Sequence, residues 1–346
     1  MASSTTSTED RRWIVLTVVC LVLALGLPAF AVRSYVKLRV RKIISADDWI
    51  MLAAAVLWFG YVACQVAACA NGFGAHTADL PEDAYYYLVG TSHNGDVVEA
   101  LRFWYTCTLF HVFTTCFVLL SAGLTVAQHI TSTPLRRLLA AALALFVLIS
   151  VAHVFLLTFQ CTPPSAFWSR NRTDTSQHCS SARTTIAWRV FTATTTAATL
   201  LLSAIPAAAL LSPGTPWRKR AAIAVPTTFA LAAATTSALQ TTQVSSLSNA
   251  ADLTFTATDF AIYALLAPSL GLVAASLATL GPWLKELGWD TEAEAEVAWR
   301  RERGGRGRRR QVGVVRGLDG EDVEAVLEEA VRQGMERLEG RGGGGE

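Results

Sequence analysis

Residues 13–32 of the chain, WIVLTVVCLVLALGLPAFAV, form a run of twenty residues without a charged side chain. A helix that crosses the hydrocarbon core of a bilayer needs about 20 mostly apolar residues. Six further runs of this kind follow, at residues 49–70, 103–127, 138–160, 186–211, 222–243 and 255–280. The sequence therefore predicts an all-α membrane protein built as a bundle of seven transmembrane helices in a lipid bilayer.

The composition divides the chain into two parts. Of all residues, 52% are hydrophobic and 16% are charged, whereas about 25% of the residues of a soluble domain are charged. The charged residues gather after Leu284. We therefore expect a transmembrane domain at residues 1–284 and a separate, charged tail at residues 285–346.

The tail has two segments of different character. RRERGGRGRRR, residues 300–310, is basic and of low complexity, so we expect it to be disordered. It resembles an RNA-binding tract, but its position next to a membrane favours anionic lipid over nucleic acid. Residues 319–339 place apolar side chains on one stripe of a short amphipathic helix. Such a helix is marginal alone, so we expect it to bind the membrane surface, a cytosolic protein or its own copy.

Basic residues, which favour cytoplasmic loops, gather between the first and second runs, the third and fourth, and the fifth and sixth. Three arginines between the fourth and fifth runs oppose this trend. The balance predicts a plasma-membrane protein with its amino terminus outside and its tail in the cytoplasm. As an alternative, residues 13–31 are a secretory signal peptide, because Ala29-Phe30-Ala31 resembles a cleavage site. Cleavage would place the basic residues that follow, Arg33 and Lys37 among them, outside the cell.

NGFGAHTADLP, residues 71–81, follows the second apolar run. A phosphate-binding loop would have to follow a strand and open a helix, and neither is expected here. Gly72 suits the left-handed conformation that ends many helices. We interpret the stretch as a helix stop, with a metal site at His76 and Asp79 as the alternative.

Several motifs occur together at set spacings. Asp47-Asp48-Trp49 opens the second run, and Gly72-x-Gly74-x-His76 follows it. FQCTPPSAFW (159–168), His178-Cys179 and GLVAASLATLGPWL (271–284) come later. In these motifs, over residues 13–285, the chain resembles the fungal rhodopsin-domain family. The resemblance implies a seven-helix, receptor-like membrane protein.

The chain departs from the family pattern at three positions. Members often carry a glutamate and a lysine in the third helix, where this chain has Thr108 and Leu119, and a glutamate near Ala267. General principles also account for part of the first motif. Acidic residues suit a first helical turn, so Asp47 and Asp48 are explained by helix capping, and Trp49 by the preference of indole rings for the membrane interface.

A family name that includes rhodopsin raises the question of retinal. A retinal Schiff base needs a lysine amine inside the bundle. The four lysines, Lys37, Lys42, Lys219 and Lys285, all lie between or after the apolar runs. We therefore expect no retinal and no other cofactor. No catalytic signature occurs in a suitable context, so we expect no enzyme.

Four ionisable residues fall inside the apolar runs, where such residues are by default functional candidates. They are His111, His153, Arg189 and Asp259. With the orientation above, all four lie in the outer half of the bundle, together with Gln240 and Gln243. This layer predicts a receptor for an extracellular ligand.

Three other interpretations remain open. Arg189 and Asp259, near helix ends, could snorkel to the membrane surface or pair for structural reasons, while the histidines bond to a Thr or Ser on a neighbouring helix. A transporter or channel is the second functional candidate, although it should carry polar residues on both sides of the midplane. A membrane-embedded metal hydrolase is a remote third, since two histidines and one aspartate are the minimum for three zinc ligands.

The loop between the fourth and fifth runs carries two expected modifications. Cys161 and Cys179 bracket the loop in an oxidising setting, so we expect them to form a disulfide, with Cys107 as a rival partner. Asn171-Arg172-Thr173 is a glycosylation sequon, and we expect Asn171 to be modified.

Overall fold

The computed structural model describes residues 10–41, 45–76, 97–130, 132–168, 178–210, 217–248 and 252–280. Within these ranges, seven helices are long and apolar enough to cross a membrane. They are α1 (Arg12–Tyr35), α2 (Ala46–Ala70), α4 (Val97–His129), α5 (Thr133–Thr158), α6 (Ser181–Leu210), α7 (Trp217–Gln243) and α9 (Thr258–Ala278). Each apolar run lies largely within one of these spans, so the predicted fold class is confirmed.

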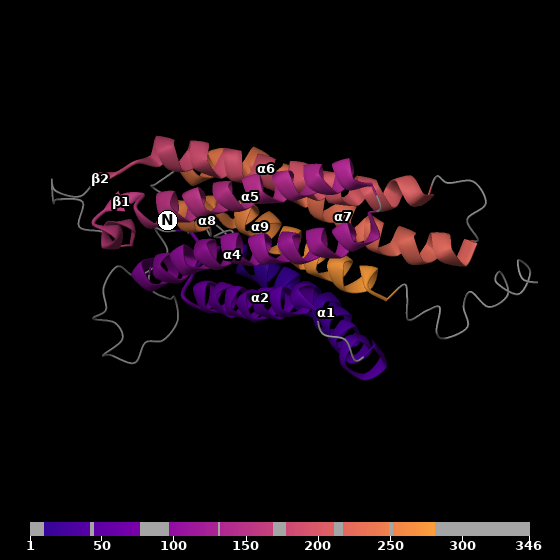
Figure 1. The fold of residues 1–346 in the computed structure, drawn as a ribbon. Helices are drawn as coiled ribbons and strands as arrows, with labels where there is room; N and C mark the ends of the chain where they lie inside the picture. The colour runs from indigo at the N-terminus through magenta and orange to yellow at the C-terminus, as the bar shows by residue number, and fades with distance from the viewer. Residues whose placement is uncertain are drawn as a thin grey trace, which may run out of the picture. The chain divides into compact units, whose positions relative to one another are not determined.

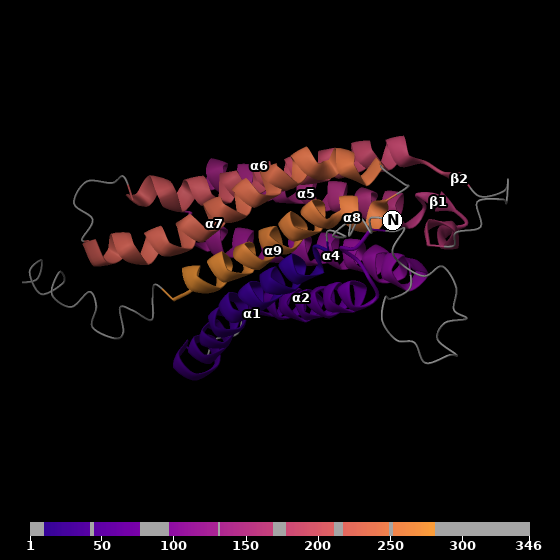
Figure 2. The same ribbon diagram turned by 180° about the vertical axis from the view of Figure 1, so that it is seen from behind.

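Short elements connect the long helices. They are the π-helix η1 (Val36–Arg41), the strands β1 (Cys161–Thr162) and β2 (His178–Cys179), the 3₁₀ helices η3 (Pro164–Phe167) and η4 (Val244–Ser248), and α8 (Leu253–Thr256). In Figures 1 and 2, β1, β2 and α8 lie at one end of the bundle. We call this the disulfide end, because the Cys161–Cys179 bond joins the two strands there. The opposite end holds η1 and the beginning of α2.

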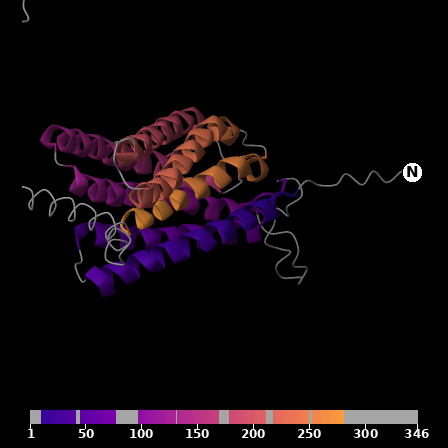
Figure 3. The same ribbon diagram turned by 90° about the vertical axis from the view of Figure 1, so that its right-hand side faces the viewer.

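Helix α9 lies at the centre of the bundle and is the most buried of the seven spans. It packs against α1, α4 and α7, so the first and last long helices are neighbours. Helix α2 packs against α4, and α6 packs against α7. Figure 3 shows α1 and α2, in indigo, forming one layer against the side of the other helices.

The outward faces of the helices are apolar. Large side chains such as Leu21, Val56, Leu148, Phe155 and Ile186 are exposed in the isolated chain. A soluble protein rarely exposes so many large apolar groups together, whereas lipid tails would cover them. The exposed surface therefore agrees with a bilayer environment.

Threonine hydroxyls hold the Ala/Thr-rich helices α6 and α7 together. The hydroxyl of Thr241 donates to the hydroxyl of Thr192 over 2.9 Å, and that of Thr196 donates to Ser237 over 3.1 Å. Hydrogen bonds of this kind between helices are used in membranes, where apolar contact alone provides no net driving force. They explain why two weakly hydrophobic segments belong to the bundle.

Helix α1 is a full member of the bundle. Its buried positions recur every three or four residues, at Val15, Val19, Val22, Gly26, Ala29 and Arg33. A Cβ atom added at Gly26 would lie 2.7 Å from the Trp58 ring of α2, so only glycine allows this close approach. Because these buried residues of α1 form part of the core of the bundle, they favour the interpretation of residues 13–31 as a transmembrane helix over that of a cleaved signal peptide.

The chain leaves α2 through the expected helix stop. The N–H of Phe73 donates to the carbonyl of Ala68, and the N–H of Gly72 donates to that of Cys69. These two bonds form a Schellman motif. Gly72 has a φ of 104°, a left-handed conformation that glycine adopts without steric penalty. The predicted helix end is confirmed.

Three sequence predictions fall outside the described residues. They concern glycosylation at Asn171, a metal-ligand role for Asp79, and the two segments of the tail at residues 300–310 and 319–339. They stay predictions.

Candidate ligand-binding site

His111 on α4 and His153 on α5 surround the same two aromatic rings of α6. The His153 ring stacks on Phe191 at a centroid distance of 4.7 Å and meets the edge of Trp188 at 4.6 Å. The His111 ring lies 5.9 Å from Trp188 and 6.0 Å from Phe191. Trp188 and Phe191 are three residues apart on one face of α6, which is why both histidines reach them. We call these four residues the histidine layer.

The histidine layer contains polar atoms without hydrogen-bond partners. His153 is 2% exposed, and neither of its ring nitrogens has a partner among the described residues. The Nδ1 atom of His111 is also without a partner there. A buried polar group without a partner costs about 1–3 kcal/mol, and native structures hold few of them. The layer therefore has hydrogen-bonding capacity that the described protein atoms do not use.

Two amide side chains lie close to the layer. The Nε2 atom of Gln240, near the end of α7, is 3.3 Å from Nε2 of His111. Gln65 of α2 is fully buried one turn from Tyr61, whose ring lies 5.8 Å from that of His111. The Gln65 amide interacts with the thiol of Cys69, one turn further along α2, and makes no hydrogen bond to a nitrogen or oxygen atom of the described residues. Sequence analysis missed Gln65, although a glutamine inside an apolar run was a signal for it.

The other two predicted ligand-binding residues lie elsewhere. Arg189 follows Trp188 on α6, but its side chain is exposed. Asp259, at the beginning of α9, is half-exposed and pairs with Arg11 over 3.3 Å. The alternative in which Arg189 and Asp259 pair with each other is therefore wrong, because Arg11, which precedes α1, reaches Asp259 instead.

The Gly72-x-Gly74-x-His76 motif joins three segments at the disulfide end. The carbonyl of Gly74 accepts a 3.0 Å hydrogen bond from the N–H of Arg11, and its N–H donates over 3.0 Å to the carbonyl of Thr254 in α8. Nδ1 of His76 lies 2.7 Å from a carboxylate oxygen of Asp252. The His76 ring stacks on Phe255 at 3.8 Å. The motif therefore ties the exit of α2 to the beginning of α1 and to α8.

Other charged groups at this junction are also paired. The guanidinium of Arg11 lies 4.6 Å from the centre of the Phe255 ring, and that of Arg12 bonds to Asp10. The hydrogen bonds from Arg12 lower the pKa of Asp10. Among the described residues, no group of three His, Cys, Asp or Glu side chains is placed to hold a metal ion. The contacts at this junction therefore join the segment before α1, the segment after α2 and α8 to one another.

A chain of aromatic contacts connects this junction to the histidine layer. Phe73, inside the helix-stop motif, stacks on Trp104 of α4 at 4.6 Å. Trp104 meets the edge of Phe260 of α9 at 6.2 Å, and Phe260 meets Trp188 at 4.9 Å. The residues of this chain are almost fully buried. Buried aromatic contacts therefore run without interruption from the histidine layer to the disulfide end.

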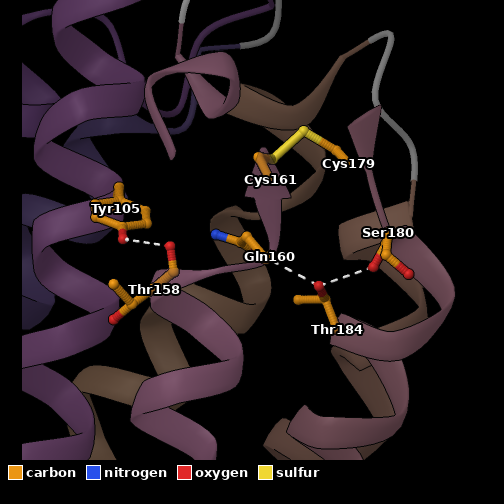
Figure 4. Close-up of a disulfide and its surroundings, with 7 residues drawn as sticks. All are labelled: Tyr105, Thr158, Gln160, Cys161, Cys179, Ser180 and Thr184. Carbon is orange, nitrogen blue, oxygen red and sulfur yellow. Dashed lines mark hydrogen bonds between the residues drawn. A yellow bond between two sulfur atoms is a disulfide. The ribbon is translucent and has the colours of Figure 1, made fainter. Parts of the chain in front are cut away.

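The disulfide closes the end of the bundle above α5 and α6. Figure 4 shows Cys161 and Cys179 bonded between β1 and β2, which confirms the predicted pair. Cys107, the rival partner, is buried with a free thiol. In the same view, the Thr184 hydroxyl donates to the carbonyl of Ser180, and the Tyr105 hydroxyl approaches the carbonyl of Thr158 at 3.4 Å. The first contact lies at the beginning of α6, and the second joins α4 to the end of α5.

The Asp47-Asp48 motif belongs to an ion-pair network at the opposite end. Arg33 lies 3.0 Å from Asp47 and 3.2 Å from Asp48, and Lys37 lies 3.4 Å from Asp47 and 2.9 Å from Asp48. Ser45 also bonds to Asp48, as expected for a helix cap, through its N–H over 3.0 Å. We call Arg33, Lys37, Asp47 and Asp48 the four-charge network.

The four-charge network corrects two expectations. Arg33 and Lys37 lie on α1 and η1, not in a loop, because the helix continues past the apolar run. Buried ionisable residues are therefore present toward both ends of the bundle, and not only in the half that holds His111 and His153. Asp47 and Asp48 thus form ion pairs with Arg33 and Lys37, a role that helix capping alone did not predict. Trp49, by contrast, is exposed at the helix end, where an interfacial indole is expected.

Seven apolar spans around a polar, aromatic interior define the class: the chain is a receptor-like seven-helix membrane protein. It belongs to the fungal rhodopsin domain family, whose family model matches residues 32–286. This match confirms the resemblance that the Asp47-Asp48-Trp49 and Gly72-x-Gly74-x-His76 motifs indicated. No curated protein and no solved structure matches the chain.

Proposed function

We propose that this protein is a receptor that senses a small extracellular ligand in the histidine layer. One observation carries the proposal: His153 is almost fully buried between two aromatic rings, and both of its ring nitrogens are without partners among the described residues. A ligand that hydrogen-bonds to this ring would satisfy both nitrogens.

A structural role for the histidines would need hydrogen bonds to Ser or Thr on a neighbouring helix. The described contacts include none of these. His111 faces the amide of Gln240, and the nearest hydroxyl group along α5, that of Ser150, already donates to the carbonyl of Phe146. The ligand interpretation therefore accounts for the unused ring nitrogens better than structural pairing does.

The proposal places the disulfide end outside the cell. Loops rich in basic residues connect helices at the opposite end, and a disulfide is stable in an oxidising compartment. In this orientation, a ligand arriving from outside meets the half of the bundle that holds the histidine layer. The plasma membrane is the corresponding location, with the tail in the cytoplasm near anionic lipids or a cytosolic partner.

The proposed receptor carries out no catalysis and binds no retinal. A Schiff base needs an amine beside the chromophore. Lys37 lies in the four-charge network at the opposite end, where two carboxylates hold its ammonium group. The uncharged histidine layer contains no lysine among its contacts within the described residues.

A transporter or channel is the second candidate function. The four-charge network favours it, because buried ionisable or polar side chains then occur toward both ends of the bundle. A translocation path would have to connect the network with the histidine layer. The network is neutral overall, however, and its contacts are internal to α1, α2, α4 and α9.

A thermal-unfolding screen tests the receptor proposal. Full-length purified protein would be melted with a library of charged and uncharged small molecules, since a ligand that binds the folded state must raise the unfolding temperature. The His153→Phe variant keeps a ring but removes both nitrogens. Phe155→Leu is the control, because Phe155 lies on the exposed face of the same helix.

We expect at least one compound to stabilise the native protein and Phe155→Leu but not His153→Phe. If no compound gives a shift that depends on His153, the receptor proposal is wrong at this site. Uptake of a stabilising compound into vesicles that contain the protein would favour the transporter instead.

A further inference from the structure

The contacts of the histidine layer are all uncharged. His111 and His153 meet the rings of Tyr61, Trp188 and Phe191 and the amide of Gln240. Among the described residues, no carboxylate, ammonium or guanidinium group contacts either ring. Several charged side chains at the disulfide end pair with each other, as in Arg11–Asp259, Arg12–Asp10 and His76–Asp252, and the Arg189 side chain is exposed.

The absence of charged groups from these described contacts restricts the net charge of a ligand that binds here. A charged group buried in an apolar layer costs much free energy unless an opposite charge accompanies it. A carboxylate or phosphate ligand would need a cation, and an ammonium ligand would need a carboxylate. The described contacts of the layer supply neither, so they suit a ligand without net charge.

The unused atoms of the layer restrict the ligand further. A neutral imidazole offers one N–H donor and one acceptor nitrogen. With both nitrogens of His153 and one of His111 unpartnered, the layer can donate to a carbonyl or hydroxyl oxygen and accept from a hydroxyl or N–H group. Hydrocarbon alone would leave these atoms unsatisfied.

The shape of the layer favours a flat molecule. His153 and Phe191 lie almost parallel, with an interplanar angle of 3°, while Trp188 presents its ring at 76° to His153. Aromatic groups prefer stacked and edge-to-face arrangements of this kind. A planar ring therefore suits the aromatic side chains of this layer better than a bulky, non-planar group does.

We infer that the ligand is an uncharged aromatic or fused-ring molecule that carries hydroxyl or carbonyl groups, bound against the rings of the histidine layer and hydrogen-bonded by His153. This inference rests on the proposed function, since it names the class of ligand for the same site. A molecule of this class also dissolves in the bilayer and can reach the layer between helices.

Three probe compounds that share the same fused two-ring system test the proposed class of ligand. They are 2-naphthol, which is neutral and hydrogen-bonding; naphthalene, which is neutral without hydrogen-bonding groups; and 2-naphthoate, which is anionic at neutral pH. Thermal unfolding of the full-length protein in lipid nanodiscs would be followed with each probe, for the native chain, His153→Phe and the exposed-face control Phe155→Leu.

We expect saturating 2-naphthol to raise the unfolding temperature of the native chain and of Phe155→Leu by about 2 °C or more. His153→Phe should bind it at least tenfold more weakly. Naphthalene and 2-naphthoate should give smaller shifts. If His153→Phe does not fold, His111→Phe serves as the second variant, with the same expected loss of affinity.

The alternative outcomes separate the two proposals. A larger, His153-dependent shift with 2-naphthoate would overturn the ligand class but leave a ligand site in place. A shift of equal size in His153→Phe would mean that the probes only partition into lipid, and the class inference would fail. If neither these probes nor the wider library gives a His153-dependent shift, the receptor proposal fails as well.

Discussion

Arg33 of α1 donates a 3.0 Å hydrogen bond to the carboxylate of Asp47 at the beginning of α2, and the two side chains are only 3% and 1% exposed. The same guanidinium donates over 2.9 Å to the carbonyl of Ala275 in α9. The hydroxyl of Ser121 in α4 donates to the backbone carbonyl of Asp47. One ion pair thus connects four helices at the opposite end of the bundle.

Removing Arg33 should destabilise the bundle strongly. Arg33→Met leaves two carboxylates facing the single ammonium of Lys37, and an uncompensated buried charge costs about 3–5 kcal/mol. The double variant Arg33→Met/Asp48→Asn restores neutrality and should recover part of the loss. Unfolding temperature and expression level measure both effects.

Arg39 provides the matched control, because it lies on η1 near the network but its side chain is exposed. Arg39→Met should change stability by no more than about 0.5 kcal/mol. Equal effects of Arg33→Met and Arg39→Met would show that the four-charge network does not stabilise the packing of the helices.

The pair formed by Arg11 and Asp259 should contribute little. Their side chains are 29% and 49% exposed, and ion pairs accessible to solvent are worth about 0–1 kcal/mol. A double-mutant cycle with Arg11→Ala and Asp259→Ala should give a small favourable coupling energy. The parallel cycle with Arg189→Ala and Asp259→Ala should give none. Coupling in the second cycle alone would contradict the pairing in the structure.

Loss of the Cys161–Cys179 bond should lower stability by about 3 kcal/mol, because the bond closes a loop over a sequence separation of 18 residues. Cys161→Ser, Cys179→Ser and the double variant should melt at similar temperatures, all below that of the native chain. Cys20→Ser, at an exposed free cysteine, is the control. Non-reduced peptides that link Cys179 to Cys107 would refute the pairing.

Asn171 should carry a glycan if the disulfide end is outside the cell. Glycosidase treatment should increase mobility on a gel, and Asn171→Gln should remove that change. A tag placed after Glu346 should be inaccessible to antibodies until the cells are permeabilised. Labelling of intact cells through this tag would reverse the proposed orientation.

The amino-acid sequence determined the elements of this fold because a membrane helix satisfies its own backbone and exposes its apolar side chains to lipid. Both requirements are local, so the seven apolar runs were enough to predict the seven spans. The end of α2 was predictable for the same reason, because it depends only on residues close in sequence. Gly72 takes the left-handed conformation and forms the Schellman motif with its neighbours. The disulfide was predictable because Cys161 and Cys179 bracket one loop, although sequence left Cys107 open as a partner.

Only the tertiary structure decided which side chains meet. His111 and His153 belong to different helices, and they lie around Trp188 and Phe191 only because α4, α5 and α6 pack with these faces together. The partner of Asp259 is 248 positions away, at Arg11. Arg33 follows the first apolar run in the sequence, but in the structure it belongs to α1, which continues past that run to Tyr35. The apolar period of a helix fixes which face is buried, but the choice of neighbouring helix depends on the packing of the whole bundle.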